Sequence, residues 1–327
     1  MTSSTMRAIE FVGPRRIVLR DDAPQPEPRE GEVLVRCSHV ALCGTNMGPY
    51  LRDGRWADPK LARPPGWLGH ENVGRIVASR AAGWEPGTLV LAHPEDYNGF
   101  AEYIRAQAAG LARLPADAPD PAAMVVAQPL ATVLRALADT GPVINQRCAI
   151  LGQGPMGLIF THLLGRMGAR QVIGIDRVPW RLRWSRRFGA TEVIDASRGD
   201  VVEAVRGLTA GKMLDFCVEA VGHPQALATA ARLPRRQGRL FAFGVPHHES
   251  QEFPWYFTVA NETRILTSMG PECMDYFQTA VGMIVQGRVD LAAMVTPRMP
   301  WARAAEAFEM YADPAGAEDS LKLTLVL

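Results

Sequence analysis

The stretch CAILGQGPMGLIFTHLLGRMGA, residues 148–169, decides how the second half of this chain folds. It opens with an apolar run typical of a buried strand and continues through the pattern Gly152-x-Gly154-x-x-Gly157. Beyond the glycines, apolar residues recur at spacings of three and four between 156 and 167, which predicts a helix. The stretch is therefore expected to form a strand, a tight glycine turn and a helix.

Glycines in such a turn let the backbone approach a diphosphate and let the helix pack closely on its strand. The free N–H groups and the positive end of the helix dipole then face the phosphates. Asp176 stands nineteen residues after Gly157, at the end of the next predicted strand, where a carboxylate accepts hydrogen bonds from an adenosine ribose. The alternative is that the glycines serve only a tight turn and that Asp176 caps a helix.

A carboxylate at this position favours NAD, because it repels the 2′-phosphate of NADP. Arg177 and Arg181 weaken this preference, since either cation can neutralise such a phosphate. The residues predicted to bind the cofactor are Gly152, Gly154, Pro155, Met156, Gly157, Asp176, Arg177, Arg181 and Val245.

The length of 327 residues favours two domains, and 35 basic against 34 acidic residues give no charged footprint for nucleic acid or a membrane. A small molecule is the expected partner. The five cysteines are scattered without a CxxC pair, which indicates reduced thiols. The N-terminus, MTSSTMRAIEF, has no signal-peptide pattern, so we expect a cytoplasmic protein.

The two halves of the chain differ in the order of their predicted strands and helices. Up to about residue 110 the chain consists of short strand-like runs broken by segments rich in Pro and charge, which is typical of a small antiparallel barrel or sandwich. From residue 148 strands and helices alternate, which predicts a doubly wound parallel sheet. Its strand candidates are residues 148–151, 171–176, 191–195, 213–221, 239–245 and 263–269.

The first half carries residues that bind metals. Cys43, His70 and Glu71 are good zinc ligands, and Gln128 lies at the hinge between the halves. Neighbours on a strand point to opposite faces, so His70 and Glu71 can share a metal only if the chain turns there. The alternative is a buried imidazole beside a solvated acid.

Several motifs together resemble the zinc-dependent medium-chain dehydrogenase/reductase family, which includes alcohol, sorbitol, threonine and glucose dehydrogenases. They are CGTN at 43–46, GHENVGRI at 69–76, QPLAT at 128–132, GQGPMG at 152–157 and DFCVEAVG at 215–222. The resemblance implies an α/β protein, with a β-rich GroES-like catalytic domain at 1–128 and 272–327 and a Rossmann NAD-binding domain at 129–271.

The same resemblance implies that Cys43, His70 and Glu71 are catalytic zinc ligands and that Thr45 takes the substrate proton. Gln128 stands where sorbitol-type relatives carry Glu and ethanol-type relatives carry Cys, and is expected to ligate the zinc or hold its water. The chain also departs from the family pattern. Asn46 replaces an acid after the relay Thr, and Gly48 replaces a relay histidine. Water, ranked first, Tyr50 and Arg52 are the alternatives for carrying the proton onward to solvent. The four-cysteine lobe of a structural zinc is missing, so we expect one zinc per chain.

The sequence therefore predicts a zinc-dependent oxidoreductase that transfers hydride between a secondary alcohol and NAD. A polyol, sugar or cyclitol is the preferred substrate class and an amino alcohol the second. The alternatives are a zinc-free enone or quinone reductase of the same superfamily and a nucleotide-binding protein without turnover. A homodimer or homotetramer is expected.

Overall fold

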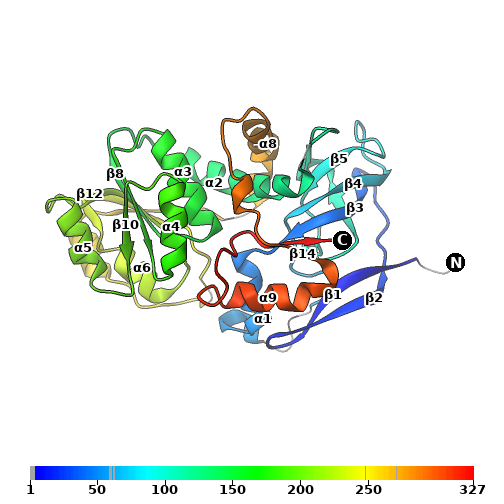
Figure 1. The fold of residues 1–327 in the computed structure, drawn as a ribbon, viewed down its shortest axis with the longest axis horizontal. Coiled ribbons are helices and arrows are strands. Elements are labelled where there is room, and N and C mark those ends of the chain that lie inside the picture. Colours follow the sequence, from blue (N-terminus) through cyan, green and yellow to red (C-terminus); the bar gives the residue numbers. More distant parts are fainter. Residues whose placement is uncertain (1–3, 59–60, 62, 119, 247, 270) are drawn as a thin grey trace. The chain divides into compact units, whose positions relative to one another are not determined.

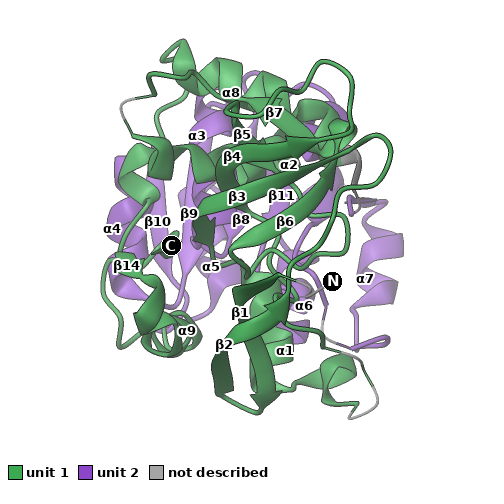
Figure 2. Ribbon diagram, turned by 90° about the vertical axis from the view of Figure 1, so that its right-hand side faces the viewer, with its two compact units in different colours: residues 1–134, 271–327 green, residues 135–270 purple. Residues whose placement is uncertain are grey.

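The computed structural model describes residues 4–58, 61, 63–118, 120–246, 248–269 and 271–327. The chain divides into two compact units, shown in different colours in Figure 2: residues 1–134 with 271–327, and residues 135–270. The sequence analysis placed these boundaries after residues 128 and 271. The first boundary falls inside helix α2 (Ala127–Ala138), which is continuous across it.

Unit 2 (135–270) is built on a parallel sheet of six strands in the order β10-β9-β8-β11-β12-β13. This confirms the predicted doubly wound sheet. Its strands are β8 (Arg147–Leu151), β9 (Gln171–Asp176), β10 (Glu192–Asp195), β11 (Leu214–Glu219), β12 (Pro234–Ala242) and β13 (Arg264–Thr267). Its helices are α3 (Pro155–Arg166), α4 (Pro179–Arg187), α5 (Val201–Leu208), α6 (Pro224–Ala230) and α7 (Trp255–Ala260).

Helices cover both faces of this sheet, as Figure 1 shows. Val205 of α5 and Ala230 of α6 belong to one buried cluster with Ala149 and Ile173 of the central strands. On the other face Phe160 of α3 packs edge to face against Phe241, with ring centroids 6.1 Å apart. The central strands β8 and β9 are buried on both sides, and most of their residues are therefore apolar instead of alternating.

Two details differ from the sequence prediction. Helix α3 buries more than the stripe expected at 156–167, since Leu158, Phe160 and Thr161 are also buried. Strand β12 begins at Pro234 and not at residue 239, because an irregularity in its pairing with β11 inserts extra residues.

Unit 1 contains a two-stranded sheet and a sheet of seven strands in the order β14-β15-β3-β4-β5-β7, with β6 also paired to β3. The strands are β1 (Thr5–Gly13), β2 (Arg16–Pro24), β3 (Glu32–Ala41), β4 (Asn72–Ser79), β5 (Leu89–Ala92), β6 (Tyr103–Gln107), β7 (Leu111–Arg113), β14 (Arg298–Pro300) and β15 (Thr324–Val326). The remaining α-helices are α1 (Met47–Leu51), α8 (Phe277–Val285) and α9 (Ala304–Ala312).

The core of unit 1 joins segments from both ends of the chain. Phe11 of β1 packs edge to face on Phe308 of α9, with centroids 5.3 Å apart, and Phe100 contacts the same ring at 5.3 Å. Leu323 and Leu325 belong to this cluster. The last strand is therefore held beside β3, the strand that leads to Cys43.

One helical stretch, Pro121–Ala138, has the length and composition of a membrane span. However, 72% of it is buried inside the structure. Such burial is typical of the core helix of a folded domain.

Gly157 is the glycine of the loop that the fold most requires. A Cβ there would lie 1.7 Å from the carbonyl oxygen of Gly152, so we expect Gly157→Ala to lower the free energy of unfolding by about 3 kcal/mol through overpacking. Gly165→Ala in the same helix is the matched control. Its Cβ would meet Gly189 O at 3.8 Å, an ordinary contact, and Ala has the higher helix propensity. Urea denaturation of both variants checks this, and equal stabilities would contradict it.

Candidate active site

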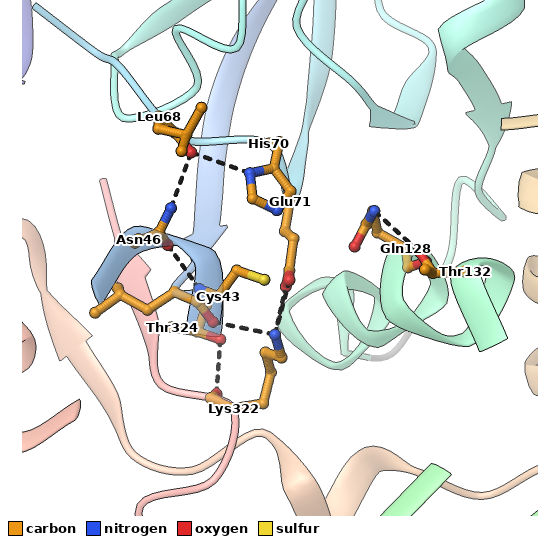
Figure 3. Close-up of polar contacts among 10 residues, drawn as sticks. Cys43, Asn46, Leu68, His70, Glu71, Gln128, Thr132, Lys322 and Thr324 are labelled. Carbon is orange, nitrogen blue, oxygen red and sulfur yellow. Dashed lines mark hydrogen bonds and ion pairs between the residues drawn. The ribbon is translucent and has the colours of Figure 1, made fainter. Parts of the chain in front are cut away.

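Cys43, His70 and Glu71 come together at the ends of two neighbouring strands (Figure 3). Cys43 follows β3 and precedes the 3₁₀ turn Gly44–Asn46, while His70 and Glu71 lie between a turn at 65–68 and the start of β4. One ligand atom of each residue lies within 4.8 Å of the other two. The turn resolves the geometric objection, because neither His70 nor Glu71 is part of a regular strand. These three residues are called the ligand cluster below.

A second set of bonds orients the ligand cluster. The Nδ1–H of His70 donates to the carbonyl oxygen of Leu68 at 3.0 Å, because a carbonyl can only accept. This leaves Nε2 as the atom free to bind a metal. Asn46 accepts from the Cys43 backbone N–H at 2.7 Å and donates to the same Leu68 oxygen at 2.9 Å. An aspartate at position 46 has no N–H for that second bond, which accounts for the amide there.

Cys43 and His70 also shift each other's pKa. Burial disfavours both ionised forms, but their mutual attraction lowers the pKa of the Cys43 thiol and raises the pKa of His70 to about 9. Each of the two residues therefore favours the charged form of the other, the thiolate and the imidazolium. The thiolate is the form of cysteine that binds metals.

Sequence reasoning missed Lys322, which is the partner of Glu71. Its Nζ donates to both carboxylate oxygens at 2.8 Å and to the carbonyl oxygen of Leu42 at 3.0 Å. Lys322 and Glu71 are 1% and 0% exposed. Residues 321–327, LKLTLVL, alternate in polarity at their start, yet Lys322 is as buried as Leu321 and Leu323.

Thr45 and Gln128 are the other predicted residues of this site. The hydroxyl oxygen of Thr45 is buried and has no hydrogen-bond partner within the described residues, so it is available to a ligand. Gln128 extends from α2 toward the ligand cluster and bonds Thr132 only weakly, at 3.4 Å (Figure 3).

Gly48, the position at which the resemblance led us to expect a relay histidine, is packed against an aromatic ring. A Cβ at this position would lie 2.2 Å from the indole of Trp56, so no side chain fits there without displacing it. Trp56 in turn packs edge to face on Trp67, with centroids 5.6 Å apart. The hydroxyl of Tyr50 already has a partner, because it donates to Glu309.

Sequence reasoning also missed two rings beside His70. The centroids of His93 and Tyr97 lie 6.3 and 6.1 Å from that of His70. Burial lowers the pKa of His93 to about 4, so its ring is neutral at neutral pH. They follow β5, in the segment without the cysteines of a structural zinc lobe.

The glycine loop of unit 2 has the predicted acid beside it. Asp176 accepts from the backbone N–H of Gln153 at 2.6 Å and of Val178 at 2.9 Å, and Nη1 of Arg181 lies 3.9 Å away. A Cβ on Gly154 would meet the same guanidinium at 3.9 Å. Arg177 is exposed. Asp176 therefore holds the glycine loop to β9. Its carboxylate and the Arg181 guanidinium both lie beside that loop.

The ligand cluster has the donors that Zn²⁺ prefers: one thiolate, one imidazole nitrogen and a carboxylate. The residues therefore fit the metal. The buried, unpaired hydroxyl of Thr45, two residues after Cys43, and a dinucleotide-type glycine loop in the same chain indicate the class, a metal-dependent oxidoreductase that uses a dinucleotide cofactor.

Comparisons with known proteins agree with this class. A GroES-like alcohol dehydrogenase domain model matches residues 29–116, and a zinc-binding dehydrogenase model matches residues 155–286. An L-threonine 3-dehydrogenase of Bacillus velezensis is 27% identical over 85% of this chain and 88% of its own length. A sorbitol dehydrogenase of Bacillus subtilis is 25% identical over 93% of both chains.

Among solved structures, a zinc-binding dehydrogenase of Sinorhizobium meliloti bound to NADP is 25% identical with a TM-score of 0.83, over 99% of this chain and 100% of that one. The chain belongs to the zinc-dependent medium-chain dehydrogenase/reductase family. It is a zinc-dependent dehydrogenase of the alcohol and polyol type, with a GroES-like unit 1 and a Rossmann unit 2.

Removing Lys322 is expected to leave the Glu71 charge buried without its partner. Lys322→Met should lower the free energy of unfolding by about 3–5 kcal/mol, as for other broken buried pairs. The double variant Glu71→Gln/Lys322→Met removes both charges and should recover part of that loss. Urea denaturation without added metal measures this, and a single variant as stable as the double would contradict it.

Proposed function

We propose that this protein oxidises a secondary alcohol with NAD and catalyses the reverse reduction, with one zinc per chain. The observation that carries the proposal is the ligand cluster together with the buried, unpaired hydroxyl of Thr45, two residues after Cys43. A protein that only bound a nucleotide would need neither feature.

In this proposal Cys43 and His70 hold the zinc through Sγ and Nε2. Glu71 contributes an oxygen while bonded to Lys322, since each carboxylate oxygen has more than one lone pair. The amide oxygen of Gln128 or a water completes the set. Bound zinc supplies a Lewis acid that lowers the pKa of an alcohol, and NAD supplies the hydride acceptor.

Thr45 is the proposed proton acceptor. Its buried hydroxyl accepts the proton of the alcohol and passes on its own. Because Gly48 carries no relay side chain, water takes the proton onward.

NAD is the proposed cofactor because the Asp176 carboxylate is fixed beside the glycine loop, where it would repel a 2′-phosphate. Arg177 and Arg181 limit this preference. The Sinorhizobium meliloti relative carries NADP, so both cofactors belong in the test.

A polyol, sugar or cyclitol is the proposed substrate class. Gln128, His93 and Tyr97 support it, because their polar atoms beside the ligand cluster suit a substrate with several hydroxyl groups. An amino alcohol is the second candidate, favoured by the threonine dehydrogenase relatives.

The proposed assembly is a homodimer or homotetramer in the cytoplasm. Trp255 and Tyr256 of α7 are 63% and 87% exposed, and Met269 after β13 is 69% exposed. Exposed aromatic rings of this kind are common where protein chains associate.

The deciding experiment measures reduction of NAD⁺ and NADP⁺ by zinc-loaded protein with polyols, sugars, cyclitols and amino alcohols. We expect turnover of at least one polyol-type alcohol with NAD⁺ preferred. Failure of every alcohol with both cofactors would overturn the proposed function.

Metal content tests the ligand cluster separately. We expect about one zinc per chain, and loss of it in Cys43→Ser, because a hydroxyl replaces the thiolate ligand. Cys37→Ser is the matched control, since Cys37 is a buried thiol on β3 that is not part of the ligand cluster. Elemental analysis of both variants after dialysis decides it. Equal zinc in both would exclude Cys43 as a ligand.

Substitution of Thr45 should separate proton transfer from metal binding. Thr45→Val keeps the shape but lacks the hydroxyl, so kcat should fall by ~10²–10⁴ while zinc content stays unchanged. Thr45→Ser keeps the hydroxyl and should retain most of the activity. A Thr45→Val variant with wild-type kcat would remove Thr45 from the mechanism.

A further inference from the structure

Glu219 is a buried carboxylate for which the proposed chemistry has no use. It is the last residue of β11 and only 1% exposed. Burying such a group is costly unless hydrogen bonds satisfy it. Burial raises the pKa of Glu219, while bonds from the backbone of Gly222, Val221 and Gly244 oppose that rise.

These bonds go to two loops. One carboxylate oxygen, Oε1, accepts from the backbone N–H of Val221 at 2.7 Å and of Gly222 at 2.9 Å. The main-chain carbonyl of Glu219 accepts from Phe243 and Gly244, both at 2.9 Å. The side chain of Glu219 therefore holds the loop after β11 (220–222), and its main-chain carbonyl holds the start of the loop after β12 (243–245).

Glycines let the two loops approach each other closely. A Cβ on Gly244 would lie 2.1 Å from the Gly222 nitrogen and 2.7 Å from Oε2 of Glu219. Gly222 has a φ of +80°, and a Cβ there would lie 2.4 Å from the carbonyl oxygen of Val245. The carboxylate is thus enclosed by backbone, and no side chain other than hydrogen fits at either position.

Loops 220–222 and 243–245 lie at the edge of the sheet where a doubly wound fold binds its ligand. The strand order runs outward in one direction from β8 and in the other from β11, so the switch point lies between these two strands. The glycine loop follows β8, and a Cβ on Gly152 would lie 2.7 Å from Cγ2 of Val221. The phosphate-binding loop therefore packs on the loop that Glu219 holds.

We propose that Glu219 is a positioning residue of the dinucleotide site, which fixes loops 220–222 and 243–245 in the shape that receives the cofactor. It acts through backbone N–H groups and does not contact the cofactor. The inference rests on the proposed use of NAD and deepens it. Val245, predicted to bind the cofactor, lies in loop 243–245, next to Gly244, whose N–H is bonded to the main-chain carbonyl of Glu219.

The test uses Glu219→Gln, which keeps an acceptor oxygen but loses the charge, and Glu219→Ala, which loses every side-chain bond. NADH affinity is measured by protein fluorescence, and folding by thermal unfolding. The loss of charge-assisted bonds should raise the Kd for NADH ~3–10-fold in Glu219→Gln and more than ~10-fold in Glu219→Ala. With alcohol turnover, the KM for NAD⁺ should rise more than the KM for the alcohol measured at saturating NAD⁺.

Asp215→Asn is the matched control on the same strand. Asp215 lies at the opposite end of β11, where it accepts from the Arg147 backbone at 2.8 Å and from Nε of Arg235 at 2.7 Å. Its substitution should reduce thermal stability and leave the Kd for NADH unchanged. If Glu219→Ala does not fold, Glu219→Gln decides the question.

Two outcomes would overturn the inference: wild-type NADH affinity in a folded Glu219→Gln or Glu219→Ala variant, or an equal loss of affinity in Asp215→Asn. Failure of the proposed function has a different signature. In that case the wild-type protein turns over no alcohol with either cofactor, whatever the NADH affinities of the Glu219 variants are.

Discussion

A fully buried ion pair between Glu71 and Lys322 is the interaction on which the arrangement of the catalytic unit depends. It joins the segment before β4 to the segment before the last strand, and the same ammonium also binds the carbonyl of Leu42, next to Cys43. Two charges that are withdrawn from water tolerate little displacement, because any separation exposes each of them to an apolar interior. The pair therefore fixes the distance between the two parts of the ligand cluster.

Asn46 and Gly48, the two departures from the family pattern, each fit their surroundings near the ligand cluster. With an amide at position 46 the residue can donate as well as accept, and so it links the Cys43 backbone to the carbonyl that also orients His70. With no side chain at position 48, the indole of Trp56 occupies the adjacent space. Both departures from the family pattern thus have a local packing or hydrogen-bonding reason that leaves Cys43, Thr45 and His70 in place.

In unit 2, two buried acids hold the backbone of loops in place. Asp176 holds the glycine loop on one side, and Glu219 holds the two loops after β11 and β12 on the other. Both residues are acids at the carboxyl ends of parallel strands, and both accept from main-chain N–H groups. Because a dinucleotide is bound largely by backbone at such an edge, the shape of these loops matters more than the side chains they carry.

The sequence by itself predicted the parallel sheet and the glycine loop with Asp176, because strand periodicity and motif spacing are local properties. The grouping of Cys43, His70 and Glu71 was implied only by the resemblance to a known family, and the turn at 65–68 that lets His70 and Glu71 share a site belongs to the tertiary structure. Only the tertiary structure revealed Lys322, His93 and Tyr97 beside that group and Glu219 between two loops. The pattern LKLTLVL at residues 321–327 indicates a strand with one solvent-exposed face, and nothing in the local sequence shows that both faces are covered. The buried charge of Glu71 is recognised by its partner, and that partner, Lys322, lies 251 residues away in the chain.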